Sequence, residues 1–179
     1  RAERVKPAVE ADRHPLVVDC SGVTLARGGA FDFVPWKFSK GELLEISVAG
    51  LAADTVLNCG HWVLPIGGDA AWVGATHEPG VLDGEPTAAG RAVLEAGARR
   101  LLDRPFRVMA HRAGVRVNLP DKRPVTGRHP MDKRCGLING LGAKGALVAP
   151  GLARQWVDHL ARGAAFDPRF DVARFWKNA

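Results

Sequence analysis

Cysteines and long apolar segments are scarce in this chain. Its three cysteines, Cys20, Cys59 and Cys135, are far apart, and no C-x-x-C pair occurs. An odd, scattered set argues against a disulfide framework and a zinc site, and it favours reduced thiols in the cytoplasm. No apolar run approaches the roughly 18 residues of a membrane-spanning helix, and no signal peptide is visible. We therefore expect a cytoplasmic protein with no membrane span and no metal site.

The composition excludes disorder but leaves the choice of partner open. The chain has 179 residues, of which 46% are hydrophobic, so it can bury a core. Its net charge of +6 suits binding to a nucleic acid. The basic residues are scattered, however, and an anionic dinucleotide or an acidic partner would explain them equally well.

The apolar pattern predicts a strand-rich middle part flanked by pieces of a parallel-sheet layer. Residues 16–20 form a short continuous apolar run, which is typical of a parallel strand buried on both faces. Gly67-Gly68-Asp69 is a hairpin signal between two strands. Further elements follow along the chain, with strands at 41–48, 57–66, 71–76 and 106–117, the last interrupted at Gly114, and helices at 87–102 and 146–160. Thr87 is the expected N-cap of the first helix, and Gly163 is expected to end the second.

Two segments carry residues that are suited to binding chemistry. Arg116 lies in an alternating strand that stops at Pro120-Asp121, where a guanidinium can hold a carboxylate through two parallel hydrogen bonds. A glycine-rich turn, Gly140–Gly145, joins a short apolar strand to a helix. Its glycines let a flat or anionic ligand approach the backbone, and the helix N-terminus favours negative charge. On these residues alone, a structural salt bridge and an ordinary turn remain the alternatives.

The order of these pieces resembles the C-terminal part of the D-amino-acid oxidase/glycine oxidase family of flavoproteins. The resemblance covers roughly residues 16 to 162. It is carried by Arg116, by the P-D-x-x-P-x-x-G segment from Pro120 to Gly127, by G-R-H-P, and by the turn described above. Upstream it is carried by W-V-L-P, which begins at Trp62, by V-G-A-T, which begins at Val73, and by K-G-E, which begins at Lys40. Val117 and Lys122 depart from the family pattern, which has proline and glycine there.

The resemblance implies an FAD-dependent oxidoreductase that oxidises a C–N bond of an amine or amino acid, with the hydride passing to FAD. Arg116 would hold the substrate carboxylate, and Trp62 and His61 are further candidates for substrate contact. Cofactor contacts are implied at Gly22 and along the turn, at Leu141, Gly142, Ala143, Lys144, Gly145, Ala146 and Leu147. No catalytic acid or base is identifiable, because in this family the protein mainly orients the amine. The chain also has no tyrosine, which is common in the active sites of these oxidases.

The family likewise implies a fold and a domain plan. We expect an α+β (α/β hybrid) fold, in which a mixed β-sheet substrate domain joins the C-terminal strand and helix of a Rossmann-like FAD-binding domain. Residues 1–36 would be the last part of the FAD-domain sheet and a linker. Residues 37–118 would be the substrate domain, and residues 119–179 would return to the FAD domain.

The expected partner is the N-terminal half of an FAD-binding domain, encoded in the same gene or as a separate chain. The family opens with a βαβ unit whose G-x-G-x-x-G turn holds the FAD pyrophosphate. No such motif occurs in residues 1–60, and the chain begins at Arg1. The strands at Leu16–Cys20 and Leu137–Asn139 are then expected to keep exposed edges for pairing with that half.

Two other functions compete with this one. A branch of the same superfamily modifies tRNA with a flavin. In that case a basic run would contact phosphates, namely Lys122, Arg123, Arg128, His129, Lys133 and Arg134. Alternatively, the chain is a non-catalytic binding or assembly module with a vestigial flavin site.

Overall fold

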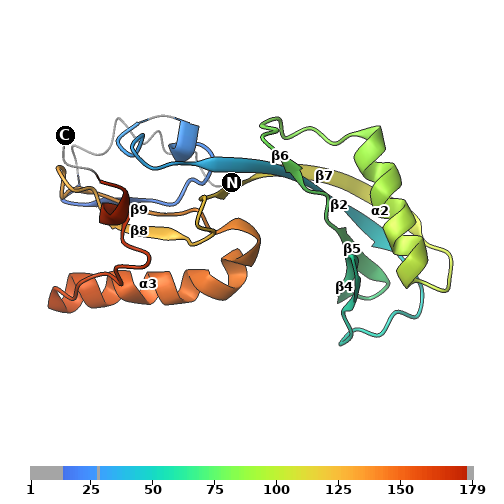
Figure 1. Cartoon of the computed structure of the whole chain (residues 1–179). Helices are drawn as coiled ribbons and strands as arrows, with labels where there is room; N and C mark the ends of the chain where they lie inside the picture. The colour runs from blue at the N-terminus through green and yellow to red at the C-terminus, as the bar shows by residue number, and fades with distance from the viewer. Residues whose placement is uncertain (1–13, 28, 177–179) are drawn as a thin grey trace. The chain divides into compact units, whose positions relative to one another are not determined.

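A computed structural model describes residues 14–27 and 29–176 of the chain (Figure 1). These residues divide into two compact units, each described here by itself. Unit 1 contains the described residues up to Lys37 and those from Arg116 onward, and unit 2 is Phe38–Val115. Two long strands cross the boundaries in the sequence, β2 (Lys37–Ser47) and β7 (Arg107–Asn118).

Unit 2 is built on a six-stranded sheet, as the sequence predicted for its middle part. Each pairing in this sheet whose register is known is antiparallel. Strand β7 pairs with β2 beside the main path. That path runs in the order β3 (Leu57–Cys59), β4 (His61–Gly67), β5 (Ala70–Gly74), β2 and β6 (Glu78–Pro79).

The segment predicted as one strand over residues 57–66 is in fact two. Gly60 adopts φ +77°, a left-handed conformation that reverses the chain between β3 and β4. Cys59 and His61 are therefore cross-strand partners and do not lie on one strand, which corrects the prediction. The hairpin predicted after β4 is confirmed, because β4 and β5 pair antiparallel across it. Strand β7 runs through Gly114 without the predicted interruption.

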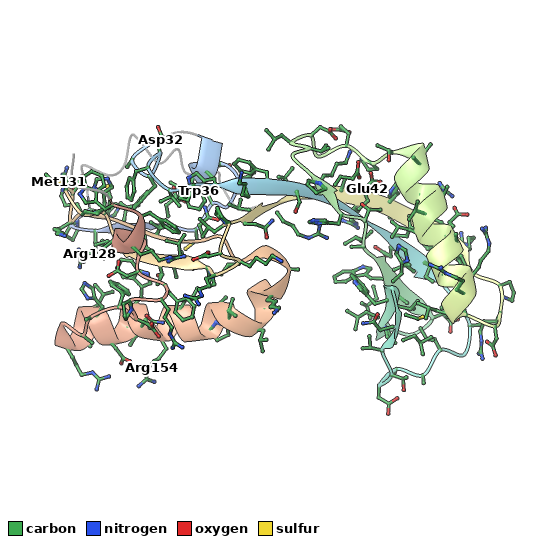
Figure 2. The ribbon with its side chains drawn as sticks, in the orientation of Figure 1. Asp32, Trp36, Glu42, Arg128, Met131 and Arg154 are labelled. Atoms are coloured by element: carbon green, nitrogen blue, oxygen red, sulfur yellow. The ribbon has the colours of Figure 1, made fainter. Side chains whose placement is uncertain are left out.

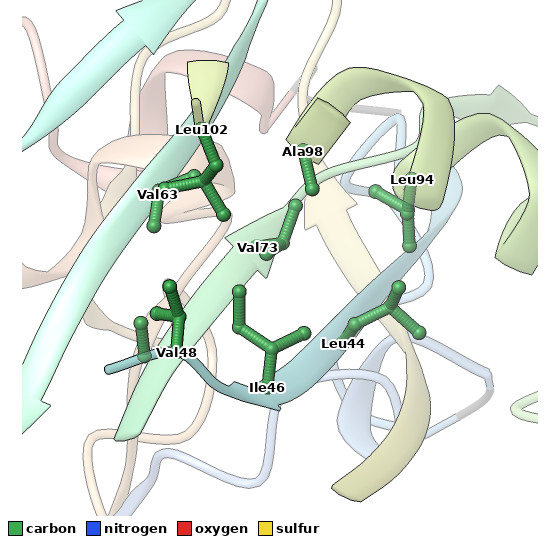
Figure 3. Close-up of a cluster of buried hydrophobic side chains, with 9 residues drawn as sticks. Leu44, Ile46, Val48, Val63, Val73, Leu94, Ala98 and Leu102 are labelled. Atoms are coloured by element: carbon green, nitrogen blue, oxygen red, sulfur yellow. The ribbon is translucent and has the colours of Figure 1, made fainter. Parts of the chain in front are cut away.

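Helix α2 (Ala88–Leu101) covers one face of this sheet. It begins where predicted, because the Thr87 hydroxyl accepts a hydrogen bond from the Gly90 N–H and caps the helix. Leu94 and Ala98 pack fully buried against side chains from three strands, Leu44, Ile46, Val63 and Val73 (Figure 3). Burial of a Leu or Val side chain contributes roughly 2 kcal/mol, so this layer supplies much of the stability of unit 2.

Unit 1 contains a smaller sheet in the order β1 (Val17–Asp19), β9 (Cys135–Asn139) and β8 (Val125–Arg128). Strands β1 and β9 are parallel, as predicted, whereas β8 and β9 are antiparallel. Because β9 lies between two neighbours, the prediction of an exposed edge at Leu137–Asn139 was wrong. In the part of the sheet that the structure describes, β1 is an edge strand, and it is half-buried rather than buried on both faces.

Helix α3 (Gly145–Arg162) packs on this sheet and follows a short 3-10 turn, η3 (Gly142–Lys144). Its buried side chains are Leu152 and Trp156, and the Trp156 Nε1–H donates to the Thr126 hydroxyl of β8 at 2.8 Å. The helix ends at Gly163, which adopts φ 68° as predicted for a C-terminal cap. Two 3-10 turns complete the unit, η2 (Leu25–Arg27) and η4 (Val172–Phe175).

Candidate functional site

The parallel pair β1 and β9 brings Gly22 beside the glycine-rich turn. Parallel strands end at the same edge of a sheet, which is where ligands of open α/β sheets bind. Asn139, the last residue of β9, is 4% exposed, and its Nδ2 donates to the Gly22 carbonyl at 2.9 Å. Its Oδ1 accepts from the Gly140 N–H at 2.8 Å. Asn139, a residue that the sequence analysis missed, thus joins Gly22 to Gly140, which directly precedes the predicted cofactor segment Leu141–Leu147.

The turn leaves the N-terminus of α3 without a capping side chain. Neither Leu141, which precedes η3, nor Lys144, which precedes α3, caps its helix with a side chain, and no acidic residue lies in the first turn of either. Ala143 and Lys144 are exposed. The positive end of the helix dipole is therefore not neutralised by side chains of its own first turn.

The turn itself has the spacing G-x-G-x-x-G, so this motif does occur in the chain, although not in its first 60 residues. Two of its glycines are in left-handed conformations, Gly140 at φ +68° and Gly142 at φ +56°. A dinucleotide-binding βαβ unit continues from its helix into a second parallel strand with an acidic residue. In the described residues after α3 the chain forms η4 and a single bridge from Asp171 to Thr126. The motif here is therefore a βα pair rather than a complete dinucleotide unit.

Arg116 lies two residues before the end of β7. It is half-buried, as is Asn118, whereas Val117 between them is 6% exposed and points to the other face of the strand. Arg116 and Asn118 consequently share a face. The Asn118 Oδ1 lies 2.6 Å from the position that a Cβ on Gly142 would occupy. The strand that carries Arg116 thus meets the turn.

The other predicted substrate residues, Trp62 and His61, belong to unit 2 and face opposite ways. Trp62 lies across its strand partner Gly74, where a Cβ would overlap the indole ring. His61 lies on the α2 side, with its Cγ 2.6 Å from the position of a Cβ on Gly97. Its Nδ1 is 3.5 Å from an Arg100 nitrogen on the same helix. Of these two residues, His61 therefore faces α2, and Trp62 lies on the opposite face of the sheet.

A buried ionic cluster beneath α2 was not foreseen. Glu42 is 0% exposed (Figure 2). Its carboxylate accepts from the Thr87 N–H at 3.0 Å and from the Thr87 hydroxyl at 2.9 Å, and it lies 2.6 Å from His111 Nε2. Lys40, also buried, lies 3.7 Å from Glu42 and 2.6 Å from Asp83. Burial raises the pKa of Glu42, but the hydrogen bonds from Thr87 and the proximity of His111 outweigh it and hold that pKa below its usual value. This cluster anchors the start of α2.

Several members of the basic run, which the tRNA hypothesis would place on phosphates, are engaged within the protein. Arg128 (Figure 2) donates from Nε to His159 Nε2 at 2.9 Å and also bonds the Lys133 carbonyl. The His129 Nδ1 accepts from the Asp132 N–H at 3.0 Å, which stabilises the turn. Arg134 pairs with Asp132 at 3.5 Å.

Comparison with known proteins assigns the chain to a family. Residues 1–159 match the model of the DAO family, described as FAD dependent oxidoreductase. The chain belongs to this family. Among the helices that the structure describes, none has the length and apolar character to cross a bilayer.

The DAO family includes relatives with stated activities. A glycine oxidase of Bacillus licheniformis is 29% identical over 122 residues, which is 66% of this chain and 33% of that protein. The structure of a glycine oxidase from Geobacillus kaustophilus superposes with a TM-score of 0.74 at 28% identity, covering 89% of this chain and 45% of that one. An iminodiacetate oxidase from Chelativorans sp. BNC1 has the same fold, with a TM-score of 0.75 at 23% identity over 87% of this chain and 44% of that one. The chain thus spans less than half the length of these relatives.

Proposed function

We propose that this chain is the C-terminal part of a DAO-family flavoprotein that oxidises a C–N bond of an amine or amino acid. The observation that carries the proposal is the convergence, in unit 1, of the Gly22 loop, the uncapped turn and the end of the Arg116 strand. Asn139 joins the first two, and Asn118, at the end of the third, lies against the turn. Arg116, our candidate for binding a substrate carboxylate, lies on the strand that meets this turn, and the turn is our candidate backbone site for an anion.

Gly22 and the glycine-rich turn of unit 1 fit the flavin end of FAD, the cofactor of the family. Gly22 has φ +64° with open space at its Cβ position, and in the turn neither Leu141 nor Lys144 caps the helix that follows it with its side chain. Gly22 and Leu141–Leu147 would hold the flavin ring. When bound, FAD supplies the acceptor for a hydride from the carbon that carries the amine.

The residues of the chain would bind and orient the substrate. The backbone N–H groups of the turn would stabilise negative charge at their edge through fixed dipoles, which need no reorganisation during the reaction. Arg116 would hold the substrate carboxylate through paired hydrogen bonds and so fix the direction of the Cα–N bond. Within unit 2, Trp62 on the sheet face away from α2 is a further candidate for substrate contact.

The named activities of the relatives support a substrate that carries a carboxylate. Glycine and iminodiacetate each combine an amine nitrogen with a carboxylate one carbon away. An arginine that binds a carboxylate in two hydrogen bonds explains why both compounds fit one kind of site. We therefore place the substrate among small α-amino or imino acids.

The test is anaerobic reduction of the flavin in a complete flavoprotein that contains this chain. Glycine and iminodiacetate would be compared with methylamine and dimethylamine, which present the same nitrogen without the carboxylate. We expect bleaching of the visible flavin bands by one or both acids and much slower bleaching by the simple amines. Equal bleaching by acids and amines would remove the role of Arg116, and a flavin that no amine or amino acid reduces would refute the proposed reaction.

A further inference from the structure

We propose that Asn118 is a positioning residue that fixes the glycine-rich turn against the strand carrying Arg116. The structural part of this proposal stands on contacts within unit 1, and its catalytic consequence rests on the proposed function. Asn118 is neither part of the family motifs quoted above nor among the residues that the sequence singled out.

The end of β7 contacts the turn through two successive side chains. The Asn118 Oδ1 lies 2.6 Å from the Cβ position of Gly142, and the Leu119 Cδ1 lies 2.7 Å from that of Gly140. A real Cβ atom tolerates neither distance, so the two side chains occupy the space that a larger residue in the turn would need. Both glycines also adopt positive φ. The turn is therefore held from one side by β7.

The two contacts differ in kind. Leu119 is 2% exposed and belongs to the apolar core of unit 1, together with Val125 and Leu137. Asn118 is half-buried, and its amide oxygen faces the first residue of η3, where the side chain of Leu141 provides no cap. Leu119 thus fixes the base of the turn by packing, while Asn118 places a directional polar group at its tip.

Asn118 also sets how far the turn lies from Arg116. Residues two apart on one face of a strand are separated by about 7 Å along the chain. A rigid strand leaves this separation little freedom, so a turn fixed at Asn118 is fixed relative to Arg116. A misplacement of about 1 Å between bound reactants can cost about 100-fold in rate. Asn118 would therefore affect the rate of reaction by aligning Arg116 with the glycine-rich turn, without touching the substrate.

The structural part is tested on the chain itself by amide NMR and hydrogen exchange. Asn118→Leu removes the polar oxygen at similar size, Asn118→Asp keeps an acceptor oxygen in place, and Arg112→Leu is a control at an exposed position of the same strand. We expect Asn118→Leu to shift the Gly140 and Gly142 amide resonances and to speed exchange there at least about tenfold. Asn118→Asp and Arg112→Leu should leave them near the wild-type values. Unchanged resonances in Asn118→Leu would overturn the proposal.

Gly142→Ala approaches the same contact from the other side and covers the case in which Asn118→Leu fails to fold. Its added methyl group collides with the Asn118 Oδ1, so its amide pattern in residues 140–145 should change as it does in Asn118→Leu. If the Gly142→Ala spectrum is unchanged in the turn, the proposed contact between Asn118 and the turn is contradicted.

The catalytic part is tested in a complete flavoprotein that contains the chain. Asn118→Leu should lower kcat by about 100-fold, with KM for the acid substrate and FAD content within about twofold of wild type, and Asn118→Asp should recover most of the loss. A loss that appears in KM or FAD content instead, or an Asn118→Asp variant as slow as Asn118→Leu, would overturn positioning. If the wild-type flavoprotein oxidises no amine, the proposed function fails while the NMR result on the turn still decides the structural claim.

Discussion

The two long helices of this chain, α2 in unit 2 and α3 in unit 1, differ in how their polar and apolar groups are paired. In unit 2, the buried carboxylate of Glu42 contacts Thr87, Lys40 and His111. The apolar side of α2 is covered by the sheet. In unit 1, the N-terminus of α3 has no capping side chain, and much of the apolar surface of that helix is exposed. Helix α2 is thus capped and packed within its unit, whereas the N-terminus and one side of α3 present groups that can bind something else.

Helix α3 shows the difference most clearly. Leu152 and Trp156 are 2% and 5% exposed on the side that packs on the sheet. A second apolar stripe recurs at helical spacing on exposed positions, Ala146, Pro150, Ala153, Val157 and Leu160. Arg154 points away from the sheet on the same open side (Figure 2). An apolar stripe of this kind is typical of a helix that contacts a further part of a protein, and the solved relatives are more than twice as long as the segment matched here.

The largest effect on stability is expected in the buried ionic cluster of unit 2. Glu42→Ala should destabilise unit 2 by about 4 kcal/mol, because it removes one partner of a buried ionic cluster and a support of the α2 cap. Urea unfolding followed by amide exchange in α2 measures the loss. Glu95→Ala, on the exposed side of the same helix, removes ion pairs with Arg91 and Arg99 and should cost less than about 1 kcal/mol. Similar losses in both variants would show that the cluster is unimportant.

In unit 1 the largest effect should be on activity and not on folding. Arg116→Ala in a complete flavoprotein should lower kcat/KM for an amino acid by about 3 kcal/mol, or roughly 100-fold, because the carboxylate loses a charged, bidentate partner. FAD content should stay unchanged. Arg112→Ala, four residues earlier on β7, is the control and should retain activity. If the Arg116 variant is as active as wild type, Arg116 is structural.

Acid should weaken unit 2 through Glu42. Because the folded pKa of Glu42 is lowered, its stabilisation is fully present above the unfolded pKa of about 4.3 and is lost as pH falls through the folded value. We expect the protection of the α2 amides, measured relative to the intrinsic exchange rate at each pH, to fall below that pH in wild type. In Glu42→Gln the loss of stability caused by protonation of Glu42 should vanish. A shallower pH dependence, caused by the other carboxylates, should remain. An identical pH profile in the two proteins would rule out Glu42 as its source.

The smallest stability effect is expected on the open stripe of α3. Val157→Ser should change the unfolding free energy by less than about 0.5 kcal/mol, as exposed substitutions usually do, but it should reduce self-association of the isolated chain. Leu152→Ala, five residues earlier on the buried side, should cost about 3 kcal/mol. Sedimentation and urea unfolding separate the two. A Val157→Ser loss as large as that of Leu152→Ala would mean that the stripe is already covered within this chain.

Local signals in the sequence predicted the ends of the elements well. Thr87 before an apolar helical pattern and Gly163 after one marked helix boundaries that the structure confirms, because capping depends on neighbouring residues alone. The reversal at Gly60 was missed, because a lone glycine inside an apolar run does not reveal its φ. The central place of β9 was missed as well, since strand order depends on residues over a hundred positions away.

The candidate site was predicted in its main parts but not in its supports. Arg116 and the turn stood out through motif order. Asn118 and Asn139 did not, because an asparagine at a strand end is common and only the fold shows which backbone it meets. Glu42 was hidden for the same reason: in sequence, a carboxylate in an alternating strand indicates a solvent-facing position, and its burial follows from the approach of α2.

The most direct test of the account is the binding of FAD by these 179 residues alone. The account gives this chain a turn for the flavin ring. It places the pyrophosphate and ribose contacts, which supply most of the affinity for a dinucleotide, on sequence outside it. The purified chain should therefore be colourless, and a fluorescence titration should show no stoichiometric complex at micromolar FAD. A yellow, stoichiometric complex with a micromolar or lower Kd would contradict the account and would assign the pyrophosphate to the turn at Gly140–Gly145.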